Sequence, residues 1–289
     1  TTGNQNTAVG YEALADTTVS EQTAVGYGAM NKNTTGAGNV AVGYRAKRYG
    51  TGHNYCTAVG YYALQGVNGY NGTHSNTAVG YQALKVTSTG GDNTAVGYNA
   101  MVANTTGTAN VAMGNAALDA NTSGAGNVAV GSAEMSISTT ASNCTAVGRE
   151  AAYNLTTGDS NTAVGRRALY THTTGTDNVA IGYQALYTNA TGNDNVAIGK
   201  DAGYLCTSSQ NVFVGGEGCG DSVTTGGECV FMGPFTGTAV TTGNGNTLIG
   251  SSAGNGITTG EYNTFVGKDA GAGSGTTTGD NCVLSLIHI

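Results

Sequence analysis

The residues that most often carry chemistry in proteins are few in this chain, and their spacing builds no catalytic set. No two of the four histidines stand at a spacing that suits a shared metal ion (His53, His74, His172 and His288). Phosphate-binding loops, nucleophile elbows and metalloprotease helices are missing. Enzymes that hydrolyse glycans place two carboxylates in a groove, and no irregular stretch holds such a pair. The sequence therefore predicts no enzyme, no metal site and no cofactor.

The six cysteines are spread along the chain (Cys56, Cys144, Cys206, Cys219, Cys229 and Cys282). Three of them replace the first Asn of a repeated phrase and are expected about 24 Å apart, too far for a disulfide between them. Cys206, Cys219 and Cys229 fall in successive repeats. The sequence leaves two alternatives for these three residues: one disulfide between two of them, or free cysteines.

Seven asparagines stand in Asn-x-Ser/Thr sequons, the acceptor motif for N-linked glycans (Asn33, Asn71, Asn104, Asn121, Asn143, Asn154 and Asn189). Four of them, at 33, 104, 121 and 189, share one place in the repeat and are predicted to line one edge of the molecule. The alternative is that Asn-Thr-Thr-Gly is simply a good bend.

Six tyrosines recur at a single place in the first repeats (Tyr11, Tyr27, Tyr44, Tyr61, Tyr81 and Tyr98). Exposed aromatic side chains often mark recognition surfaces, so this column is a candidate site for a glycan or a receptor. The alternative is mutual stacking of the rings. A second column is expected at residues 153, 170, 187 and 204.

All of these residues are placed by one short phrase, Asn-Thr-Ala-Val-Gly, first seen at residues 6–10. It occurs sixteen times in all, mostly 17 residues apart, up to residues 263–267, with a degraded seventeenth copy at 281–285. A short fixed period over a whole chain indicates a solenoid, in which each repeat contacts only its neighbours. The sequence predicts an all-β, parallel β-solenoid of 16–17 coils, with a single domain over residues 1–283. The end at 284–289 breaks the pattern and resembles a sequence artefact.

Within one coil, numbered from the leading Asn as position one, the β-branched residues at positions two and four predict a strand. The turn residues near positions fifteen to seventeen predict bends, and we expect two short strands joined by two bends in each coil. Side chains alternate across a strand, so positions three and four point to opposite faces although both are apolar. We expect positions three and nine to meet in a thin core, and positions four and eight to form an outward apolar face.

The core prediction rests on a volume exchange along the chain. Coils one to eleven combine Ala at position three with a large residue at position nine, whereas coils thirteen to sixteen combine a large residue with a small one, and coil twelve is a hybrid. The predicted core includes Ala8, Ala95, Leu14, Met101, Phe213, Phe231, Leu248 and Phe265. The small partners of the last four coils are predicted at 219, 237, 254 and 271. The predicted outward face includes Val9, Val96, Val130, Val164 and Ile198.

Charged residues make up only 9% of the chain and the net charge is −7, with no basic stripe, which argues against a nucleic-acid partner. No apolar run approaches the ~20 residues that a membrane span requires.

The phrase Asn-Thr-Ala-Val-Gly followed by Ala resembles the head-domain repeat of trimeric autotransporter adhesins. The fuller form at 76–84 is similar to repeats in phage tail-fibre and related surface proteins, and the resemblance covers about residues 3–283. It implies a left-handed parallel β-roll, three chains packed side by side, and an extracellular place on a cell surface or virion. The autotransporter repeat is usually shorter, so the extra Asn-Thr-Thr-Gly bend is expected to change the cross-section.

The sequence therefore predicts an extracellular structural fibre: a filament, adhesin or phage tail-fibre shaft. Its expected partners are copies of itself, as a lateral trimer or a head-to-tail filament, and a surface glycan or receptor. One alternative is an ice-binding protein that uses Thr ladders, prompted by Thr pairs such as 105–106 and 173–174. The other is a glycan-degrading tail spike.

Overall fold

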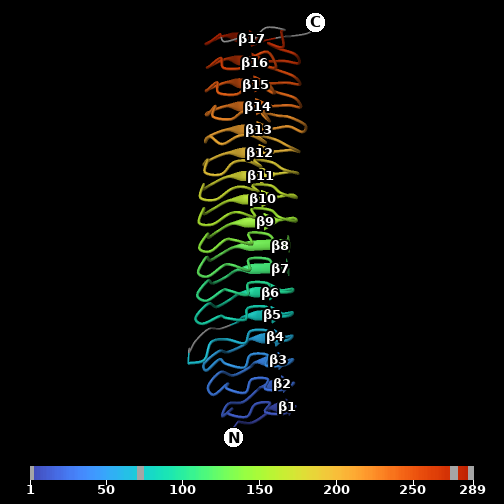
Figure 1. Cartoon of the computed structure of the whole chain (residues 1–289), viewed down its shortest axis with the longest axis vertical. Coiled ribbons are helices and arrows are strands. Elements are labelled where there is room, and N and C mark those ends of the chain that lie inside the picture. The colour runs from blue at the N-terminus through green and yellow to red at the C-terminus, as the bar shows by residue number, and fades with distance from the viewer. Residues whose placement is uncertain (1–2, 70–74, 274–278, 286–289) are drawn as a thin grey trace. The chain divides into compact units, whose positions relative to one another are not determined.

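The computed structural model describes residues 3–69, 75–273 and 279–285. The chain divides into two compact units, Thr1–Cys144 and Thr145–Ile289, which are described one at a time. In each unit, successive coils place one short strand beside the strand of the coil before it, so that the strands build a parallel sheet (Figure 1). The described residues contain no helix. The predicted all-β parallel solenoid with coils of about 17 residues is confirmed. Its handedness stays a prediction.

The first unit contributes eight strands. They are β1 (Thr7–Val9), β2 (Thr23–Val25), β3 (Val40–Val42), β4 (Thr57–Val59), β5 (Thr77–Val79), β6 (Thr94–Val96), β7 (Val111–Asn115) and β8 (Val128–Ser132). Equal positions pair in register: Ala78 lies opposite Ala95, and Ala95 opposite Ala112. The repeat period therefore converts residues 17 apart in the sequence into neighbours in space.

The second unit contributes nine strands. They are β9 (Thr145–Val147), β10 (Thr162–Val164), β11 (Val179–Ile181), β12 (Val196–Ile198), β13 (Val212–Val214), β14 (Val230–Met232), β15 (Thr247–Ile249), β16 (Thr264–Val266) and β17 (Val283–Ser285). The last pair joins Phe265 to Leu284, so the degraded seventeenth copy forms a strand. Residues 284 and 285, which the sequence pattern assigns to the atypical tail, belong to this strand.

The predicted second strand of each coil is wrong, because the described coils hold one strand each. After the glycine at position five, the residues at positions seven and nine have left-handed backbone angles, as in Gln82 (φ 55°) and Leu84 (φ 49°). An extended strand does not contain such angles. Left-handed and ordinary backbone angles alternate in this segment, so the N–H groups at positions seven and nine point to opposite neighbouring coils. The N–H of Gln82 donates to Tyr61 of the preceding coil (2.9 Å), and the N–H of Leu84 donates to Ala100 of the following one (3.0 Å).

The interior of each coil is formed by positions one, three, eight, nine and twelve. Ala95 and Met101, at positions three and nine, are fully buried, but so is Ala100 at position eight. The prediction that position eight faces outward is therefore wrong, because the curled segment around positions seven to nine turns its alanine inward. The prediction that Ala8 belongs to the core is also wrong, because Ala8 is exposed. Its strand β1 pairs only with β2 among the described strands.

In the second unit the volume exchange is seen as direct contact between positions three and nine. A Cβ on Gly237 would lie 2.5 Å from the ring of Phe231, and a Cβ on Gly254 would lie 2.4 Å from Leu248. The contact also reaches the next coil: a Cβ on Gly203 would lie 2.6 Å from the ring of Phe213. Coil twelve is a hybrid because the first large ring of coil thirteen leans over it, so its own position nine must already be small.

The predicted assignment of Cys219 to position nine of coil thirteen is wrong. Its carbonyl at Cys219 accepts the N–H of Gly203, as the position-eight carbonyl of Ala202 accepts the N–H of Leu186. Cys219 therefore stands at position eight. Gly220 takes position nine, where a Cβ would lie 2.5 Å from Phe213.

Candidate interaction surfaces and buried polar groups

The outward face of each sheet is a row of apolar side chains at position four. Seven of them are 37–57% exposed (Val9, Met113, Ile181, Ile198, Met232, Ile249 and Val266). Val96, Val130 and Val164 are partly exposed in the same rows. Position two, on the same side of the strand, alternates between Thr and Val and is also partly exposed. We call positions two and four together the strand face. No described helix covers it.

The tyrosine column of the first unit is a continuous stack. Ring centroids from Tyr11 to Tyr98 are 5.0–5.3 Å apart, with interplanar angles of 2–16°. The second column, Tyr153 to Tyr204, stacks at 5.1–5.5 Å. The stacking alternative is confirmed. Inside a column, each tyrosine ring covers the face of the next ring. Only the ring edges therefore remain exposed to a ligand. A sugar that binds to an aromatic face has access only at the ends of a column.

Four of the seven sequons contradict the predicted glycan edge. Asn33, Asn104, Asn121 and Asn189 are fully buried. The Nδ2 of Asn104 donates to the carbonyl of Gly107 (3.1 Å), and Asn121 makes the same bond to Gly124 (3.1 Å). This amide closes the bend from inside the coil, so a glycan on it has no room. The same position holds Leu155, Val240 and Ile257 in other coils, a signal of burial already present in the sequence.

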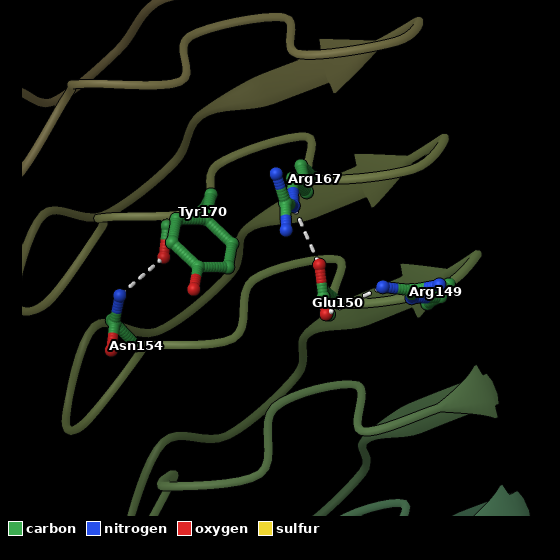
Figure 2. Close-up of polar contacts among 5 residues, drawn as sticks. All are labelled: Arg149, Glu150, Asn154, Arg167 and Tyr170. Carbon is green, nitrogen blue, oxygen red and sulfur yellow. Dashed lines mark hydrogen bonds and ion pairs between the residues drawn. The ribbon is translucent and has the colours of Figure 1, made fainter.

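The other three sequons differ from one another. Asn143 is exposed. Asn154 is partly buried, and its Nδ2 donates to the carbonyl of Tyr170 (2.9 Å) (Figure 2). Asn71 lies outside the described residues.

A surface ion-pair group lies on the first two coils of the second unit (Figure 2). The Nε of Arg167 lies 2.6 Å from one carboxylate oxygen of Glu150, and an Arg149 nitrogen lies 3.2 Å from the other. The hydrogen bond from Arg167 lowers the pKa of the Glu150 carboxyl. The Arg167 guanidinium also lies 5.3 Å from the ring centre of Tyr170. The group couples adjacent coils, and no nucleophile or second acid accompanies it.

The leading asparagines form a buried ladder. The N–H of Asn110 donates to Oδ1 of Asn93 (3.0 Å), and the N–H of Asn127 donates to Oδ1 of Asn110 (2.9 Å). The Nδ2 of Asn110 donates to the carbonyl of Gly124, fourteen residues on (2.8 Å). Each side chain thus satisfies a backbone donor of the next coil and an acceptor of its own bend.

The six cysteines form no disulfide, and five of them are buried. Burial raises the pKa of Cys219 to about 12 and that of Cys229 to about 11. These thiols therefore stay protonated and unreactive. The described residues contain no group of three or more side chains suited to hold a metal ion.

Two buried charged residues were missed at the sequence level. Glu134 occupies position eight, where the other coils of this unit carry Ala, and Lys47 occupies position nine, where Leu or Met is the rule. Both are fully buried. Burial raises the pKa of Glu134 to about 7 and lowers that of Lys47 to about 8. Both could have been found as single exceptions to an otherwise apolar column.

Searches against protein-family models, curated proteins and solved structures found no match to this chain. Within the described part of the chain, no helix is long and apolar enough to cross a bilayer.

Proposed function

We propose that this chain is a structural segment of an extracellular fibre, which associates with further copies of itself through the strand face. The observation that carries the proposal is the row of exposed and partly exposed apolar side chains at position four in each unit. Contiguous exposed apolar side chains of this kind often mark a protein–protein interaction surface. The sparse charge of the chain, 9% of residues, leaves few groups that would oppose the approach of a second copy.

The internal structure is also suited to a mechanical role. Every coil donates backbone hydrogen bonds to its neighbours, and the Asn ladder and the Tyr columns add side-chain contacts in the same direction. Nearest-neighbour contacts of this kind resist bending without requiring a large globular core. The proposal includes no catalytic activity and no cofactor.

Sedimentation velocity and electron microscopy of the purified chain test the proposal. We expect oligomers or filaments for the native chain, and dissociation when Met113→Glu and Ile198→Glu place a charge on the strand face. The matched control Thr106→Glu alters an exposed side chain away from that face and is expected to leave assembly unchanged. A native chain that sediments as a monomer at micromolar concentration would refute the proposal.

The ice-binding alternative receives less support. The first Thr of each pair uses its hydroxyl within the solenoid: Oγ1 of Thr105 donates to Thr122 (2.9 Å), and Oγ1 of Thr173 donates to Ala190 (2.9 Å). The second Thr of these pairs, Thr106 or Thr174, is exposed on a bend. Thermal hysteresis of the purified chain would revive this alternative.

A further inference from the structure

The third coil carries a lysine inside the core. Lys47 is fully buried at a position that holds Met30 in the preceding coil and Leu64 in the following one. No carboxylate forms an ion pair with it among the described residues. Burial lowers its pKa to about 8, so a substantial share of the amine is neutral near physiological pH. A neutral, desolvated lysine amine is a nucleophile.

The group that faces this amine is a carboxamide. The Nζ of Lys47 lies 3.1 Å from Oδ1 of Asn33, which is itself fully buried in the second coil. The Nδ2 of Asn33 donates to the carbonyl of Gly36 (2.8 Å) and to Oε1 of Gln22 (3.3 Å). These bonds fix the amide plane and hold its carbon beside the amine. Such fixed proximity can lower the activation free energy well below that of the same reaction between two separate molecules.

A group able to move protons lies beside the same amine. His53 is buried, and a Cβ on Gly50 would lie 3.0 Å from its Nδ1 and 3.3 Å from Nζ of Lys47. The imidazole and the amine therefore border one small volume. An imidazole can act as a general acid or base in a proton transfer.

We infer that Lys47 and Asn33 join in an intramolecular isopeptide bond that ties the second coil to the third. The amine of Lys47 attacks Cγ of Asn33, and a new Nζ–Cγ bond forms. The Cγ–Nδ2 bond then breaks. A proton from Nζ passes to Nδ2, which leaves as ammonia, and the imidazole of His53 is the neighbouring group available to assist this transfer. One amide replaces another, so the step needs no oxidant or reductant, and the dry core keeps water from competing for the carbonyl carbon.

Intact-mass measurement of the purified full chain tests this bond. We expect a mass below the sequence mass by one ammonia, completed by incubation at about pH 9, where the amine with a pKa of about 8 is neutral. Proteolysis followed by tandem mass spectrometry is expected to yield a branched peptide joining Lys47 to Asn33.

The variants separate this bond from other losses of ammonia, such as ring closure at an Asn-Gly pair. Lys47→Met is expected to keep the full mass. Asn33→Asp is expected to lose water instead, because the leaving group changes. Asn104→Ala, at the equivalent position of a coil without the lysine, is expected to retain the ammonia loss. A native chain at full mass after incubation, or an ammonia loss that persists in Lys47→Met, would overturn the inference.

Discussion

At the scale of single residues, the buried polar groups carry the clearest consequences. A β-solenoid of this kind buries little apolar area per coil, so each interior position matters. Most interior polar side chains are satisfied, as the Asn ladder illustrates. Glu134 is one of several exceptions: it is fully buried, and both of its carboxylate oxygens lack a hydrogen-bond partner within the described structure.

Glu134 makes stability depend on pH. Its folded pKa of about 7 lies above the unfolded value, so the folded state holds the proton more tightly. The contribution of Glu134 to stability is therefore greatest at low pH and declines as the pH rises from about 4.5 through 7, by about 3 kcal/mol in total. Glu134→Gln is expected to remove this decline, measured as the free energy of unfolding in denaturant across the pH range. Glu21→Gln, at an exposed carboxyl, is the control and is expected to keep it. Equal pH slopes in native chain and Glu134→Gln would contradict the assignment.

The Asn ladder can be tested at one rung. Asn110→Ala removes the acceptor for the N–H of Asn127 and leaves that donor buried and unpaired, whereas the carbonyl of Gly124 keeps the bond from Nδ2 of Asn121. We expect a loss of about 1–3 kcal/mol, the cost of one orphaned backbone donor. Urea denaturation followed by circular dichroism measures it. The neighbouring exposed residue supplies the control, since Thr108→Ala is expected to change stability by less than about 0.5 kcal/mol.

At the scale of the coil, stability depends on complementary volumes across a thin core. Phe231 and Gly237 form one such pair in the second unit. The left-handed angle at Gly237 (φ 61°) is close to that of Leu186 (φ 50°), the equivalent residue of an Ala/Leu coil. The backbone at this position therefore accepts a leucine, and the obstacle to Gly237→Leu is the phenyl ring.

A double-mutant cycle tests this complementarity. Phe231→Ala is expected to cost about 3–5 kcal/mol through the cavity it leaves, and Gly237→Leu more than about 2 kcal/mol through overpacking. The combined variant restores the Ala/Leu type and is expected to lose at least about 1 kcal/mol less than the sum of the single changes. Free energies of unfolding from denaturant titrations give the coupling. Additive losses would mean that the two side chains do not share one space.

At the scale of the whole molecule, the chain behaves as a sum of coils and nearest-neighbour contacts. Deleting residues 93–109, one full period, keeps every remaining residue in register. We expect this variant to fold with a modest decrease in thermal stability. Deleting residues 93–100 instead brings unlike positions into line and is expected to abolish cooperative unfolding. Thermal melts followed by circular dichroism distinguish the two, and equal damage from both deletions would argue against register as the stabilising principle.

Most of the architecture was predictable from the period. Because residues 17 apart pair in register, a repeated phrase is enough to predict the parallel sheet, the Tyr stacks and the exchange of volumes between positions three and nine. The candidate sites were less predictable. A sequon records only that Asn is followed by Ser or Thr, and it does not say which way the side chain points. Asn33 and Asn104 turned out to face inward for that reason.

The sequence by itself determined which residues become neighbours along most of the stack, because a period of 17 leaves only one register. Coil thirteen, whose register the structure corrected, is an exception. The tertiary structure decided which of them face the core. That choice depends on the left-handed angles at residues such as Gln82 and Leu84, which side-chain preferences disfavour and which only the hydrogen bonds to the coils on either side stabilise. Those angles remove the second strand, turn position eight inward, and leave position four as the apolar row that meets solvent.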